Sequence, residues 1–235
     1  MKVHFLFCTA AIAAFASCTA QAQVRQPRQL TNFEVVRSSG GIDVFLTQGP
    51  TTAVLVEASA ETQPHVVTEV KGNTLTIGWE TDYSWRNLLS SKRKVSVYIT
   101  CPRLTGVALS GGADARGNSN FTADDFRIEA SGGSDVKLTL TAKTLTSVAS
   151  GGSDCSLAGR VGRQSVQVSG GSDYHAFDLQ STTADVRASG GSDVSLTVEG
   201  ELSSSVSGGS DVRYKGAARL AASQASGGGG VRHVQ

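Results

Sequence analysis

The sequence predicts an all-β protein, most of which is a parallel β-solenoid with coils of about 18–21 residues. The main observation is a repeated motif, Ser-Gly-Gly-Ser-Asp or a close variant, whose successive starts lie 21, 19, 19, 20, 18 and 19 residues apart. Such a period is typical of solenoid coils. Apolar and polar residues also alternate on both sides of the motif, which indicates short strands with one buried face. The copies begin at Ser110, Ser131, Ser150, Ser169, Ser189, Ser207 and Ser226, and an isolated early copy covers residues 39–43.

Residues 1–22 predict a secretory signal peptide. Lys2 precedes an apolar run, and small residues follow it up to a cleavage site near Ala22. The run of about eleven residues is too short to cross a bilayer, which takes roughly 20, and no later segment is apolar enough to do so. We therefore expect an extracytoplasmic protein, in the periplasm, on the outer surface or secreted, with a short tail at residues 23–30. The alternative is a lipoprotein signal cleaved before Cys18, whose thiol would carry a lipid anchor.

Residues 31–108 predict longer strands that open the same solenoid, so that residues 31–235 form a single domain. Strands are expected at residues 33–36, 42–47, 53–58, 66–71, 74–79 and 95–100. A loop at residues 80–93 interrupts them and carries four apolar side chains, Tyr83, Trp85, Leu88 and Leu89. These side chains either cover an open end or side of the column or form an exposed patch that contacts a partner.

Residues 109–235 predict the regular coils. The two glycines of each motif predict a tight corner with positive φ, so a β-branched residue at Gly152 or Gly171 should be costly. If the coils stack in register, the motif aspartates form a row with a spacing of about 4.8 Å, and their mutual repulsion needs an offset. The row consists of Asp114, Asp135, Asp154, Asp173, Asp193 and Asp211.

The aspartate row has two interpretations. In the first, main-chain N–H groups or serine hydroxyls of the corner donate hydrogen bonds to the carboxylates, as in Asx turns. In the second, the row holds calcium, because aligned carboxylates are hard oxygen ligands. The last motif copy, at residues 226–231, lacks the aspartate, which indicates that the residue matters only between neighbouring coils. The sequence favours the first interpretation and predicts no cofactor, with calcium as the alternative.

Composition and motifs exclude several functional classes. Without the signal peptide the chain has 20 basic and 20 acidic residues, because that peptide removes one of the 21 basic residues; this balance gives no overall attraction to nucleic acid. Cys155 occupies an apolar position of the repeat, which favours a core role over a disulfide with Cys101. His65, His175 and His233 are isolated, and no zinc spacing, nucleophile elbow or phosphate-binding loop occurs. An enzyme is not predicted.

Four segments resemble a known bacterial family, the head GIN domain of putative auto-transporter adhesins, a domain of unknown function. They are Gly41-Ile42-Asp43 with the strand after it, residues 72–77, residues 95–104, and the Ser-Gly-Gly-Ser-Asp coils. Asp43 stands where the Gly-Ile-Asn segment of the family has asparagine. The resemblance covers residues 31–231 and implies a right-handed parallel β-helix.

The function expected from these observations is that of a non-catalytic exported binding or surface-structure protein. It would be adhesin-like and would contact a glycan or another protein through the flat sides of a rigid column. One alternative is a polysaccharide-active β-helix enzyme, in which Asp135, Asp154 and Asp173 bind calcium or act in acid/base steps. The short loops and few neighbouring basic residues disfavour it. A second alternative is a self-associating scaffold of the cell envelope.

Overall fold

The computed structural model describes residues 23–81 and 94–235, whose strands join into one sheet. The first half holds β1 (Gln23–Arg28), β2 (Val35–Ser39), β3 (Ile42–Gln48), β4 (Ala53–Ser59), the 3-10 helix η1 (Gln63–His65), β5 (Val66–Lys71), β6 (Thr74–Trp79), β7 (Val95–Cys101) and β8 (Gly106–Ser110). The second half holds β9 (Ala115–Ser131), β10 (Val136–Ser150), β11 (Asp154–Ser169), β12 (Asp173–Ser189), β13 (Asp193–Gly208), β14 (Asp211–Lys215), β15 (Arg219–Gly227) and β16 (Gly230–His233).

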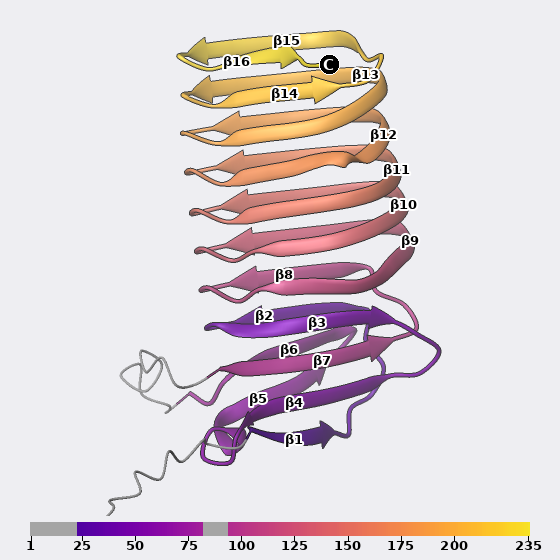
Figure 1. Ribbon diagram of the computed structural model, residues 1–235, viewed down its shortest axis with the longest axis vertical. Helices are drawn as coiled ribbons and strands as arrows, with labels where there is room; N and C mark the ends of the chain where they lie inside the picture. The colour runs from indigo at the N-terminus through magenta and orange to yellow at the C-terminus, as the bar shows by residue number, and fades with distance from the viewer. Residues whose placement is uncertain (1–22, 82–93) are drawn as a thin grey trace, which may run out of the picture.

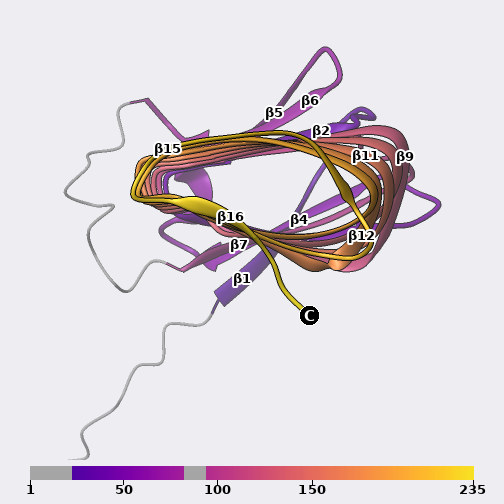
Figure 2. The same cartoon turned by 90° about the horizontal axis from the view of Figure 1, so that it is seen from above.

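Strands β9 to β16 form the predicted parallel β-solenoid. Each coil from β9 to β13 is one continuous strand of 15–17 residues that bends midway and supplies both broad faces of the column (Figure 1). Seen from above, the coils superpose as a flattened ring (Figure 2). The near strands of Figure 1 run to the right and the far strands to the left as the chain climbs, so the solenoid is right-handed.

The coil register follows from the apolar residues after each motif. β10 and β11 pair in parallel from Val136↔Cys155 to Ser150↔Ser169 without a shift. Because the side chains of a strand alternate between its two faces, this register stacks one inward row directly on the next. The row after the aspartates, Val136, Cys155, Tyr174, Val194 and Val212, is at most 1% exposed. Burial of each large apolar side chain stabilises the fold by about 1.5–3 kcal/mol.

The early motif copy belongs to the same column, although about seventy residues separate it from the next copy in sequence. Gly40 N–H donates to the Ser110 carbonyl over 3.2 Å, and β3 pairs in parallel with β9 through Val44↔Ala115. β2 pairs with β8 in the same way. Residues 39–43 therefore form the corner directly below residues 110–114.

The N-terminal end of the column departs from the parallel pattern. β4 pairs antiparallel with β7, and β1 pairs antiparallel with β4 from Gln23↔Ser59 to Arg28↔Val54. The segment at residues 23–30, expected as a tail, thus contributes a strand. Its sequence carries no alternation of apolar residues, so the periodicity of the chain could not reveal it.

The two glycines of a corner differ in what they require. Gly151 has φ +69°, and a Cβ there would lie 3.2 Å from the main-chain nitrogen of Gly132 in the coil below. Gly152 has φ +78°, but a Cβ there would meet nothing within 4 Å. Both positions strain a residue with a side chain, and the first also crowds the neighbouring coil.

Cys101 and Cys155 are both buried, and they form no disulfide. Burial raises the pKa of the Cys101 thiol to about 11 and that of Cys155 to about 12. Both side chains therefore act as apolar core residues, as the repeat position of Cys155 predicted. Within the two described ranges no helix is long and apolar enough to cross a membrane.

Candidate functional site

The motif aspartates lie in one row, where successive coils begin after the corner. The register pairs Asp154 with Asp173, Asp173 with Asp193, and Asp193 with Asp211. The row also begins one coil lower than the sequence indicated, since the Asp114 main-chain N–H lies 3.4 Å from a carboxylate oxygen of Asp43. The early motif copy could have revealed this member, because Asp43 holds the same place in it.

The main chain of the next coil supplies hydrogen-bond donors to this row. The Asp135 N–H donates to the Asp114 carboxylate over 3.1 Å, and the Asp193 N–H donates to the Asp173 carboxylate over 3.2 Å. A carboxylate that accepts main-chain N–H groups is stabilised in its charged form. Each such bond thus offsets part of the repulsion along the row.

A second row, the basic row, runs beside the aspartates on the same outer face. Five of its seven members are arginine, lysine or histidine, and the other two are Ser156 and Ser195. The row occupies the position two residues after each aspartate, where side chains point to the same side of the strand. The register aligns Arg116, Lys137, Ser156, His175, Ser195, Arg213 and Arg232. Arg213 lies 3.8 Å from the Asp193 carboxylate and 3.9 Å from that of Asp211. This row was not predicted from the sequence, although its spacing from the motif is constant.

Two members of the aspartate row keep raised pKa values. Burial first, and then the neighbouring carboxylate of Asp114, raise the pKa of Asp43 above its usual value. Burial and the carboxylates of Asp114 and Asp154 do the same for Asp135. The hydrogen bonds and the basic row thus leave part of the repulsion in place.

The row shows no arrangement suited to a metal ion. Among residues 23–81 and 94–235, no three carboxylate, histidine or cysteine side chains are grouped so that they could hold one. The expectation of no cofactor, with calcium binding by the row as its alternative, stays a prediction.

The second serine of the motif forms a third row, inside the corner. Ser134, Ser153, Ser172, Ser192 and Ser210 have no exposed surface. The Ser172 hydroxyl accepts the N–H groups of Gly152 and Ser153, 3.1 and 3.0 Å away, while the Ser153 hydroxyl donates to the Ser150 carbonyl over 3.0 Å. Because buried N–H groups need partners, this row connects one corner to the next and has an architectural role.

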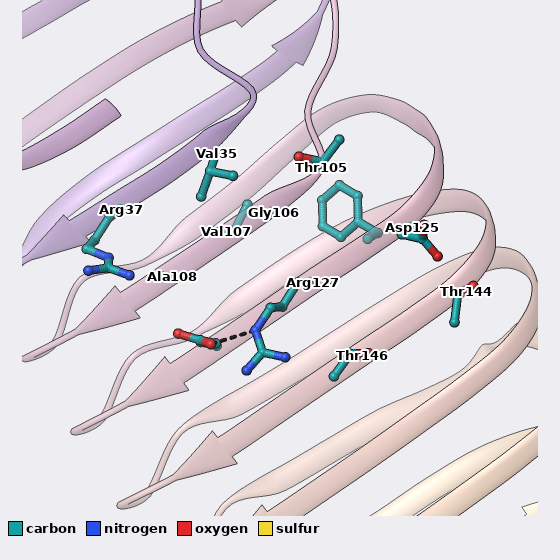
Figure 3. Close-up of a pocket in the computed structure, with 12 residues that line it drawn as sticks. Val35, Arg37, Thr105, Gly106, Val107, Ala108, Asp125, Arg127, Thr144 and Thr146 are labelled. Atoms are coloured by element: carbon teal, nitrogen blue, oxygen red, sulfur yellow. Dashed lines mark hydrogen bonds and ion pairs between the residues drawn. The ribbon is translucent and has the colours of Figure 1, made fainter. Parts of the chain in front are cut away.

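The broad face formed by β2, β8 and the second halves of the later coils carries a groove that was not predicted from the sequence. It has a volume of about 590 Å³ and lies over β2, β8 and the second halves of β9 and β10 (Figure 3). A second hollow of about 410 Å³ shares Arg37, Ala108 and Glu129 with it. Together they follow the chain from Thr105 through β8 to Ser110, a length of roughly 17 Å at about 3.3 Å per residue.

The groove is hollow because β8 has small residues in its outward positions. Arg37, Ala108 and Glu129 occupy equivalent positions in successive coils, and so do Val35, Gly106 and Arg127. Gly106 and Ala108 thus form a low floor between longer side chains above and below. A glycine and an alanine at neighbouring outward positions were the signal that could have indicated it.

The groove walls carry fixed polar groups. Arg127 Nε donates to the Glu129 carboxylate over 2.6 Å, which holds both side chains in place (Figure 3). Arg37 is exposed and makes no ion pair or hydrogen bond with any residue that the structure describes. Asp125, Thr105, Thr144 and Thr146 complete the polar lining. The groove therefore offers hydroxyl, carboxylate and guanidinium groups in an extended, shallow depression.

The other predicted sites lie outside the described residues. These are the patch at Tyr83, Trp85, Leu88 and Leu89, the lipid-anchor candidate Cys18 and the signal peptide at residues 1–22. Their roles stay predictions.

Known proteins resemble this chain in sequence pattern and in fold. The family described as "Putative auto-transporter adhesin, head GIN domain" matches residues 32–218. No curated protein matches the sequence. The crystal structure of a putative adhesin from Bacteroides fragilis is similar, with a TM-score of 0.81, 19% identity, and coverage of 92% of this chain and 98% of that one.

Two structures from Parabacteroides distasonis share the fold as well. A putative adhesin has a TM-score of 0.74 and 21% identity, over 92% of this chain and 98% of that one. A protein described as a putative lipid binding protein has a TM-score of 0.66 and 18% identity, over 91% and 97% of the two chains. At these identities the likeness shows the β-solenoid fold.

Proposed function

We propose a function from the premise that this chain belongs to the family described as "Putative auto-transporter adhesin, head GIN domain". The protein is non-catalytic and extracytoplasmic, and it binds a glycan chain in the groove over β8. The observation that carries the proposal is the elongated groove itself, with its low floor at Gly106 and Ala108 and its polar walls. A depression of roughly 17 Å along the strands suits an extended polymer better than a small compact ligand.

The chemistry of the walls supports a saccharide ligand. Hydroxyl groups of a sugar need both donors and acceptors, and the groove offers both through Arg37, the Arg127–Glu129 pair and three threonine hydroxyls. Val35 and Ala108, which are both partly exposed, add apolar surface. Because the groups are carried by a hydrogen-bonded sheet, little backbone freedom is lost on binding.

The polysaccharide-active enzyme gains no support from the groove. Hydrolysis of a glycosidic bond needs one carboxyl group that stays protonated near neutral pH. Of the two carboxylates in the groove, Glu129 is held by Arg127 and Asp125 is exposed to solvent. Neither stands in a confined, water-excluding position that would favour such chemistry.

A glycan array probed with the purified protein tests the proposal, followed by calorimetry with the polysaccharide that binds. Arg37→Ala removes the unpaired guanidinium and Ala108→Trp fills the floor, so we expect each to weaken binding by about tenfold or more. Arg187→Ala is the matched control, because Arg187 occupies the same outward row above the groove and should leave affinity unchanged.

Three results would overturn the proposal. Absence of binding to any glycan would remove the ligand class. Equal affinity of Ala108→Trp and the unmodified protein would remove the groove as the site. Release of shorter oligosaccharides from a bound polymer, followed by chromatography of the products, would make the protein an enzyme.

A further inference from the structure

The C-terminal end of the column exposes a strand edge. β15 pairs with β13 and β16 pairs with β14, and within the described chain neither has a strand partner on its other side (Figure 1). All nine residues of β15 are exposed. The N–H and C=O groups of such an edge are a template for another extended strand.

The last layer of the core is exposed at the same end. Leu220 lies directly on Leu202 in the register, yet Leu220 is 43% exposed whereas Leu202 is fully buried. Apolar surface and unpaired backbone groups therefore occur together at this end. A partner that covers both needs a strand and a core layer of its own.

The composition of this edge contrasts with that of the opposite one. The edge strand β1 carries Arg25, Pro27 and Arg28, and charge and proline are the features that keep sheet edges from pairing with other chains. From Leu220 to Val231 the chain has no charged residue and no proline. The two edges thus differ in the features that prevent association.

We infer that the C-terminal edge is a self-association surface at which a second copy of this chain pairs its β15 antiparallel to β15, around a two-fold axis near Ser223. Two-fold symmetry makes the surface complementary to itself. In this register Ala222 of one copy opposes Gln224 of the other, and the two Arg219 side chains lie at opposite ends of the pair. No like charges meet within the β15 pair, and each copy places its last core layer on that of the other.

Sedimentation of charge variants tests this surface. Ala222→Lys with Gln224→Lys places lysines opposite lysines across the proposed pair, and Ala222→Glu with Gln224→Glu does the same with carboxylates. We expect the unmodified protein to dimerise with rising concentration and each double variant to raise the dissociation constant about tenfold, because like charges directly opposite destabilise strand pairs. Mixing the two variants should restore the dimer as a heterodimer.

A matched control keeps the test specific. Ser203→Lys with Ser205→Lys puts the same two charges on the same outer face one coil lower, since Ser203 and Ser205 pair with Ala222 and Gln224, and should leave the dimer intact. A protein that stays monomeric at every concentration would overturn the inference. So would a dimer that the edge lysines do not weaken, or lysine and glutamate variants that fail to combine.

Discussion

The buried serine row gives a quantitative prediction, the cost of Ser172→Ala. The Ser172 hydroxyl accepts two main-chain N–H groups, from Gly152 and Ser153, and the side chain has no exposed surface. Alanine removes the partner of both donors, of which the Ser153 N–H is buried and the Gly152 N–H is partly buried. Each unsatisfied buried group costs about 1–3 kcal/mol. Since the two donors share one oxygen, we expect a loss of about 3 kcal/mol. For a chain of 150–250 residues this lowers the melting temperature by roughly 6–12 °C.

Urea unfolding followed by far-ultraviolet circular dichroism measures this loss, with Ser169→Ala as the control. Ser169 belongs to the same motif copy, but its hydroxyl makes no hydrogen bond within the part of the chain that the structure describes. We expect Ser169→Ala to change the unfolding free energy by less than about 0.5 kcal/mol. If Ser172→Ala costs no more than Ser169→Ala, the serine row does not connect the corners and the reasoning is wrong.

Three further predictions concern the corners of other coils and the aspartate row. Asp135→Asn should stabilise the protein by at most about 1 kcal/mol at pH 7, because it removes repulsion from two neighbouring carboxylates and keeps an oxygen that can accept a hydrogen bond. The raised pKa of Asp135 means that the folded state holds its proton to a higher pH than the unfolded state, whose value is near 3.8. Stability contributed by the protonated form is thus lost as pH rises through the raised folded-state pKa. The gain from asparagine should therefore shrink toward zero by pH 3 in thermal melts, and a gain independent of pH would contradict this origin. Gly151→Ala should cost about 2–3 kcal/mol and more than Gly152→Ala, because both are strained at positive φ but only the first crowds the coil below; equal losses in urea unfolding would count against the close approach of the corners. Millimolar calcium and chelation by EDTA should leave the melting temperature unchanged, and a calcium-dependent rise would support metal binding by the aspartate row.

The repeat made the solenoid predictable, since Ser-Gly-Gly-Ser-Asp and its period set the corner, the register and the core row at once. Two aspects escaped for physical reasons. The copy at residues 39–43 looked isolated because the strands and hairpin between it and Ser110 form the N-terminal end of the column, and contacts between distant segments leave no local period. β1 was missed because a paired edge strand with both faces exposed needs no apolar alternation.

The candidate sites were less predictable than the fold. A row such as that of the aspartates follows from one motif and its spacing, so the sequence indicates it directly. The groove exists because the side chains of Gly106 and Ala108 are small. The side chains of Arg37 in the coil below and of Arg127 and Glu129 in the coil above are longer. That comparison requires the register between β2, β8 and β9, which only the folded chain provides.

Removal of one complete coil tests most directly whether the motif is architecture. Deletion of residues 135–153 joins Ser134 to Asp154, restores an intact motif and lets β11 stack on β9 in the place of β10. Small-angle scattering with thermal unfolding should show a cooperatively folded column shortened by about 4.8 Å. Deletion of residues 135–144, half a coil, should abolish cooperative folding because it breaks the register. If the complete-coil deletion unfolds as readily as the half-coil deletion, the motif is not a modular corner of a solenoid.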